Sequence, residues 1–196
     1  STTGWALKHL FGTSTWNGAL LGYDASDPAN LTQLSSTLIS NRVIDITGEG
    51  TTVVVASGPN HRSHPGDLLV YDVTNPQAPH WVGATTLSTG ALDGTPSRIK
   101  LRNEKVYAAT WGKGIQIADV LQMKSGFAEC CSAAYFSMVD ALNRDGGSFN
   151  TGAVTTINVI DPNSSAKPWM RDISVIDVNG ETIIAVASSI GLVLAT

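Results

Sequence analysis

One short phrase recurs three times along the chain and constrains the fold more than any other feature. It consists of a glycine, a run of apolar residues and a closing aspartate, at residues 18–24, 66–72 and 114–119. The closing residues Asp24, Asp72 and Asp119 are 48 and 47 residues apart. A period of this length indicates supersecondary units that bury their apolar residues by stacking on their neighbours.

A second phrase with the pattern of a β-hairpin occurs at residues 42–56, 98–109 and 171–187. Its first two occurrences precede the second and third copies of the first phrase. Each hairpin phrase consists of an apolar strand, a polar turn and a second apolar strand. The clearest turn is Asn179-Gly180, because Asn-Gly between two apolar runs is a strong hairpin signal. The aspartate of the first two copies is followed by a turn that contains Pro28 or Pro76. Proline presets φ in such turns, and a preceding Asp or Asn caps them. Together, the two phrases and the turn predict four antiparallel strands in each unit, which is the size of one propeller blade.

The strand-Asp-turn phrase resembles the bacterial LVIVD-type repeat, most closely at residues 68–76 and also at residues 20–28. The resemblance implies a β-propeller from a secreted or cell-surface bacterial protein. It implies no particular activity, because one fold hosts many functions.

We therefore expect an all-β chain: a propeller or partial propeller of about four four-stranded antiparallel blades, with one helical insertion. Residues 1–196 form a single domain in this interpretation, with blade units at about 1–40, 41–90, 91–165 and 166–196. The first and last units hold too few strands for a full blade, so we expect a fragment of a larger protein.

The insertion, residues 121–153, separates the third aspartate from the last strand of its blade. Apolar residues at helical spacing predict a helix over residues 126–142, ended by residues 143–147. This segment contains Tyr135, a candidate binding residue, and the adjacent Cys130 and Cys131, which are either two thiols or a vicinal disulfide. Asn143 and Asp145 form at most half of a calcium loop, so no cofactor is expected and calcium is a weak alternative.

Charge and hydropathy exclude two classes of partner. The net charge is −4 and only 14% of residues are charged, which argues against a nucleic-acid ligand. No apolar run approaches the roughly 20 residues that a membrane-spanning helix needs.

The densest polar cluster is the loop at residues 60–67. His61, His64 and Asp67 are the best candidates for acid–base catalysis, with Arg62 as a binding residue. The alternative is an ordinary solvated loop. Trp111, at the end of an inner strand, is the best candidate for an exposed aromatic binding residue. The repeated aspartates, by contrast, predict turn caps, because a position repeated in every unit serves the fold.

Three functions fit this interpretation. The favoured one is a non-catalytic binding or structural module, extracellular or on the cell surface, with a protein or glycan ligand. The second is a propeller hydrolase or lyase with its site at the central channel. The third is an assembly subunit whose ring or fibre is completed by blades of neighbouring chains.

Overall fold

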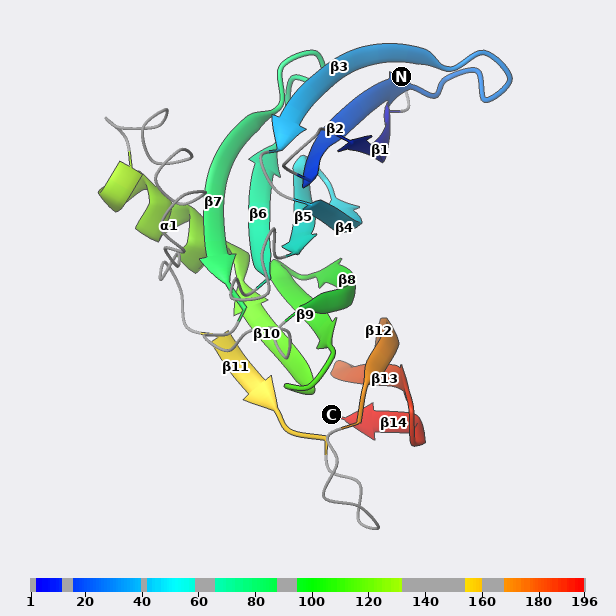
Figure 1. Cartoon of the computed structure of the whole chain (residues 1–196), viewed down its shortest axis with the longest axis vertical. Helices are drawn as coiled ribbons and strands as arrows, with labels where there is room; N and C mark the ends of the chain where they lie inside the picture. Colours follow the sequence, from blue (N-terminus) through cyan, green and yellow to red (C-terminus); the bar gives the residue numbers. More distant parts are fainter. Residues whose placement is uncertain are drawn as a thin grey trace.

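The computed structural model describes residues 3–11, 16–39, 42–58, 66–87, 95–131, 154–159 and 168–195. Within them the protein is mostly β, with four antiparallel sheets and one short helix (Figure 1). In each sheet the strands are hydrogen-bonded in chain order, so each sheet is a simple meander. This confirms the predicted all-β class.

The first and last sheets have three strands each, and the two middle sheets have four. The first two sheets comprise β1 (Thr3–Phe11), β2 (Trp16–Asp24) and β3 (Thr32–Ile39), then β4 (Arg42–Glu49), β5 (Thr52–Gly58), β6 (Asp67–Asp72) and β7 (His80–Thr86). The last two comprise β8 (Pro96–Arg102), β9 (Lys105–Thr110), β10 (Ile115–Asp119) and β11 (Val154–Ile157), then β12 (Met170–Val178), β13 (Glu181–Ser188) and β14 (Gly191–Ala195). In the described chain the first and last units thus have fewer strands than the two middle ones, as expected from the sequence.

The sheets stand side by side in chain order, with the first and last at opposite ends of the molecule (Figure 1). An apolar layer fills each of the three spaces between neighbouring sheets. The first strands β4, β8 and β12 neighbour one another across these layers. Across the described residues, the four sheets form an arc and not a closed ring.

The second sheet is buried on both faces. On β5, Val54 and Ala56 face the layer shared with the third sheet, whereas Val53 and Val55 face the layer shared with the first. Successive strand residues point to opposite faces, so a strand with two covered faces is apolar at every position. This explains the unbroken apolar runs of the repeat phrase.

Two hairpin turns behave as their sequences predict. Asn103 and Glu104 have φ values of 49° and 59°, and Asn179 and Gly180 have values of 53° and 85°. Two successive positive φ values define the two-residue turn whose twist matches that of antiparallel strands. The predicted hairpins at these positions are confirmed.

The repeated aspartates serve the backbone. The Asp24 carboxylate accepts the N–H of Ser26 at 2.9 Å, and the Asp72 carboxylate accepts the N–H of Thr74 at 2.8 Å. Hydrogen bonds from Ser26 and Thr74 lower the pKa of Asp24 and Asp72 below the usual range, so both are ionised at neutral pH. Carboxylates in this state cap turns and are not proton donors.

The third aspartate instead begins a helix. Asp119 accepts the N–H of Gln122 at 3.0 Å, which caps helix α1 (Val120–Cys131). The predicted start at residue 126 is therefore wrong by six residues, because the side chain expected to cap a turn caps the helix. The remainder of the predicted helix, residues 132–142, lies outside the described residues.

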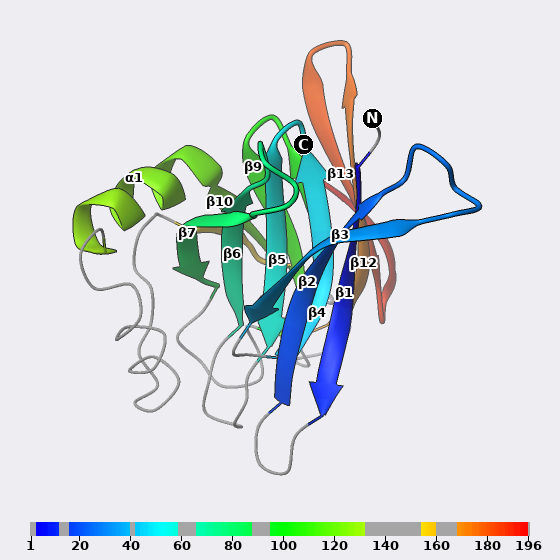
Figure 2. The ribbon, with the colours of Figure 1, turned by 90° about the horizontal axis from the view of Figure 1, so that it is seen from above.

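Helix α1 leaves the third sheet and packs on β7 of the second (Figure 2). Gly83 permits this approach, because a Cβ there would lie 2.9 Å from the Met123 carbonyl carbon. The Met123 side chain is fully buried in the layer between these two sheets. The helix therefore joins consecutive sheets as a clamp.

Polar side chains also join the sheets. The Asp45 carboxylate on β4 accepts the N–H of Ile99 on β8 at 2.8 Å, and the Thr47 hydroxyl accepts that of Leu101 at 3.0 Å. Between the last two sheets, Arg102 and Asp177 form an ion pair at 2.8 Å that lowers the pKa of Asp177. Because β8 is the edge strand of its sheet, the backbone N–H groups on its outer side have no neighbouring strand to pair with. The β4 side chains accept hydrogen bonds from these groups in place of a strand.

Candidate functional site

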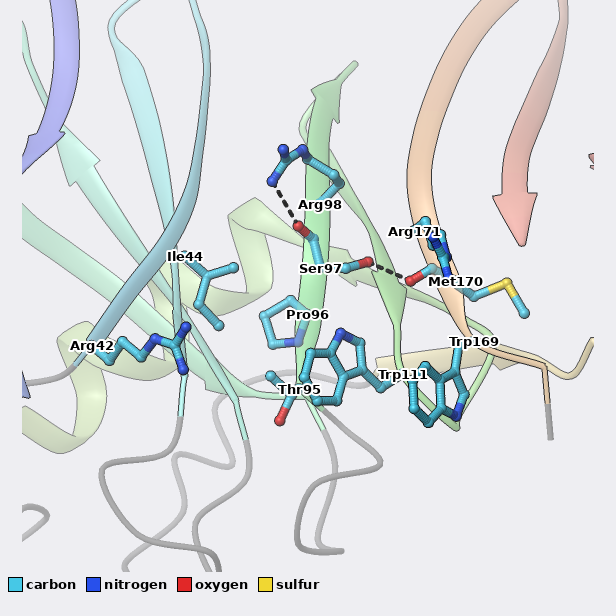
Figure 3. Close-up of a pocket in the computed structure, with 10 residues that line it drawn as sticks. All are labelled: Arg42, Ile44, Thr95, Pro96, Ser97, Arg98, Trp111, Trp169, Met170 and Arg171. Atoms are coloured by element: carbon cyan, nitrogen blue, oxygen red, sulfur yellow. Dashed lines mark hydrogen bonds between the residues drawn. The ribbon is translucent and has the colours of Figure 1, made fainter. Parts of the chain in front are cut away.

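A pocket of about 470 Å³ opens where the first strands β4, β8 and β12 begin (Figure 3). Its volume lies within the range of small-molecule sites. The lining comes from three consecutive sheets and comprises Arg42, Ile44, Thr95, Pro96, Ser97, Arg98, Trp111, Trp169, Met170 and Arg171. A ligand bound here would contact all three sheets.

A β-bulge near the start of each first strand shapes the pocket. The register shifts between Val43 and Asp45 on β4, between Pro96 and Arg98 on β8, and between Met170 and Asp172 on β12. The extra residue in each case, Ile44, Ser97 or Arg171, lines the pocket. Bulges redirect side chains and recur next to functional sites.

Three arginines give the pocket its charge. Arg42, Arg98 and Arg171 are exposed, and Figure 3 shows Arg42 reaching from β4 toward Pro96 and Thr95. The Arg98 guanidinium donates to the Ser97 carbonyl at 3.1 Å, which uses one of its five N–H donors. The described lining contains no Asp, Glu, His or Lys side chain. The site is therefore a locally cationic surface on a chain of net charge −4.

Two tryptophans form the aromatic wall. The rings of Trp111 and Trp169 are stacked with centroids 5.9 Å apart and planes 11° apart. Their side chains come from the third and fourth sheets and remain 43% and 59% exposed. A large apolar ring pair left this open can stack on a ligand ring.

Thr95 adds an unused polar group. It is only 6% exposed, lines the pocket, and its hydroxyl has no hydrogen-bond partner in the described structure. An unpaired buried hydroxyl costs about 1–3 kcal/mol. A ligand oxygen or N–H that reached Thr95 would recover that free energy.

Of the predicted binding residues, the structure places Trp111 at this pocket. The predicted catalytic residue Asp67 begins β6, where its buried carboxylate accepts the Thr86 hydroxyl at 2.9 Å. The other predicted site residues lie outside the described residues: His61, Arg62, His64, Tyr135, Asn143 and Asp145. Cys130 and Cys131 end helix α1, and the placement of their side chains also lies outside what is described.

Sequence reasoning missed Arg42, Arg98, Arg171, Trp169 and Thr95. One signal was present, because an arginine stands near the start of each hairpin phrase. The three arginines nevertheless occupy different positions relative to the bulge of their strand. Only the assembled sheets show that all three reach one pocket.

The described residues contain neither a group of metal-ligating side chains nor a membrane-spanning helix. Within the seven described segments, no three His, Cys, Asp or Glu side chains group as metal ligands. The one described helix is too short to cross a membrane. Among known proteins, neither a family model nor a curated protein matches the sequence.

Proposed function

We propose that this chain is a propeller-type binding module whose ligand occupies the pocket at the start of β4, β8 and β12. The observation that carries the proposal is the convergence of three consecutive sheets on one pocket with an exposed Trp111–Trp169 pair. The LVIVD-type resemblance remains a prediction and suggests a secreted or cell-surface setting, with a protein or glycan as ligand.

The propeller interpretation has three supports. The sheets are consecutive antiparallel meanders, their first strands are neighbours, and each of β4, β8 and β12 has a bulge near its start. In a propeller the first strands surround the central channel, so the pocket would lie at the channel mouth. The described chain would then be an arc of such a ring.

The chemistry of the pocket favours binding over catalysis. Hydrolase and lyase sites depend on side chains that transfer protons near neutral pH, chiefly histidines and carboxylates. The described lining offers arginines, tryptophans and hydroxyls instead. Arginine stays protonated throughout the neutral range, so it binds anions and does not exchange protons.

An array of surface glycans and peptides tests the proposal with the wild type, Trp111→Ala and the control Leu38→Ala. Leu38 is an exposed apolar residue on β3 that does not line the pocket. We expect Trp111→Ala to weaken binding of the retained ligand about tenfold or more, because it removes half of the stacking surface. The control should bind like the wild type.

The retained ligand is then incubated with the wild type and analysed by chromatography, where we expect it unchanged. New products would support the hydrolase or lyase alternative. An array without any ligand, or equal binding by Trp111→Ala, would contradict the proposed module.

A second candidate function, assembly with neighbouring chains, has its own observation. The face of the last sheet opposite the third sheet exposes Leu192 by 73% and Leu194 by 65%, together with Ile176. In the second and third sheets, both faces are covered by neighbours. A sheet supplied by another chain would cover this face in the same way.

Sedimentation velocity over a range of concentrations tests assembly. We expect the wild type to exceed the mass of one chain and Leu192→Glu/Leu194→Glu to return to it, because two buried charges would oppose docking. The control Leu31→Glu places one charge on an exposed leucine between β2 and β3. A wild type that stays monomeric at the highest concentration would exclude assembly.

A further inference from the structure

We infer that the ligand of this pocket is an acidic saccharide, a sugar ring that carries a carboxylate. The inference rests on the proposed function and names the ligand class for the same pocket. The juxtaposition that carries it is three arginines, one stacked tryptophan pair and one unpaired buried hydroxyl within about 470 Å³.

Two of the three arginines, Arg98 and Arg171, are available to an anion. The nearest carboxylates along β4 and β12 are engaged with the backbone, since Asp45 accepts the N–H of Ile99 and Asp172 accepts the N–H of Ile173. For the side chain of Arg171 the described residues offer no hydrogen-bond partner, and Arg98 uses only one donor. A guanidinium binds a carboxylate through two parallel hydrogen bonds, which makes it selective for that group.

The arginine side chains of the lining distinguish an acidic sugar from three uncharged ligand classes. Neutral sugars, uncharged peptides and nucleobases offer the guanidinium groups no anionic partner, so they form no ion-paired hydrogen bonds with them. The described lining contains no Asp, Glu, Asn or Gln. A carboxylate presents acceptors only, so it matches arginine and the Thr95 hydroxyl without leaving a donor unpaired.

The tryptophan pair fits the ring of the same ligand. An indole face is apolar, and so is the C–H face of a pyranose ring, while the polar groups of both lie at their edges. Trp111 and Trp169 border the pocket together with Arg98 and Arg171 (Figure 3). One ligand can therefore stack its ring and place its carboxylate on an arginine at the same time.

Isothermal titration calorimetry tests the inference with trimers of galacturonate, glucuronate and mannuronate. The matched probe is the methyl ester of each trimer, which keeps the ring and removes the charge. We expect at least one uronate to bind, with affinity about tenfold lower for its ester, because charge-assisted hydrogen bonds contribute roughly that factor. Binding should also weaken as salt is raised, since the ion pairs are solvent-accessible.

Two double variants locate the charge effect. Arg98→Ala/Arg171→Ala removes two charges from the pocket, and Lys100→Ala/Lys105→Ala removes two exposed charges that do not line it. We expect about a tenfold loss of uronate affinity or more in the first variant and none in the second. Circular dichroism would confirm that both keep the wild-type sheet content.

The inference is overturned if no uronate binds, if the ester binds as well as the acid, if the arginine variant keeps wild-type affinity, or if only hexaglutamate or adenosine monophosphate binds. A neutral glycan that depends on Trp111 would refute the acidic ligand and leave the proposed module standing. If no ligand on the array depended on Trp111 for binding, the module itself would be refuted.

Discussion

The Met123→Ala variant is expected to lose about 3 kcal/mol of its free energy of unfolding. Met123 is fully buried on α1, in the apolar layer that also contains Leu68 of β6 and Ile99 of β8. Truncation would leave a cavity where the helix joins the second and third sheets. The close approach of α1 to Gly83 holds the backbone in place, so the cavity cannot collapse easily.

Urea unfolding followed by tryptophan fluorescence measures this loss. The matched control is Leu121→Ala, because Leu121 lies on the same helix and is exposed. The control should change the free energy of unfolding by less than about 0.5 kcal/mol. If both variants unfolded at the same urea concentration as the wild type, α1 would not clamp the two sheets.

The second large effect is expected for Asp45→Ala, at about 2 kcal/mol of unfolding free energy. The Asp45 carboxylate is the acceptor for the N–H of Ile99, a fully buried residue on the edge strand β8. Alanine would leave this N–H buried without an acceptor. A buried, unpaired donor loses its whole solvation, which costs more than the hydrogen bond gained.

Asp45→Asn is the control, since its side-chain oxygen can still accept the hydrogen bond. Hydrogen exchange of the Ile99 amide reports the contact directly and should accelerate in the alanine variant far more than in the asparagine variant. Equal acceleration in both variants would show that the negative charge of Asp45, and not its acceptor geometry, holds the second and third sheets together.

Much of the local structure was predictable because its causes lie within a few residues. The turn at Asn179-Gly180 has positive φ at both positions, where Asn and Gly are the residues that tolerate it best. Asp24 and Asp72 each accept an N–H two residues along the chain. The same reasoning failed at Asp119, because one side chain can cap either a turn or a helix and the next residues decide which forms.

The candidate site was far less predictable. The sequence pointed to the loop at residues 60–67, since its histidines stand together in the chain. Residues 60–65 of that loop lie outside the described residues, so this prediction stays open. The pocket gathers Arg42, Arg98 and Arg171 from segments more than fifty residues apart, with Trp169 stacked on Trp111. Spacing along the chain does not show which side chains of different sheets will lie next to one another.

By itself, the sequence determined the strands, their hairpins and the turn caps, because each depends on φ preferences, alternation of apolar residues and hydrogen bonds of short range. The tertiary structure decided how the sheets face one another, where α1 docks and which side chains share the pocket. These depend on long-range packing, in which Gly83 admits a helix and bulges redirect single side chains. No local pattern encodes such contacts, because each of them needs both partners already in place.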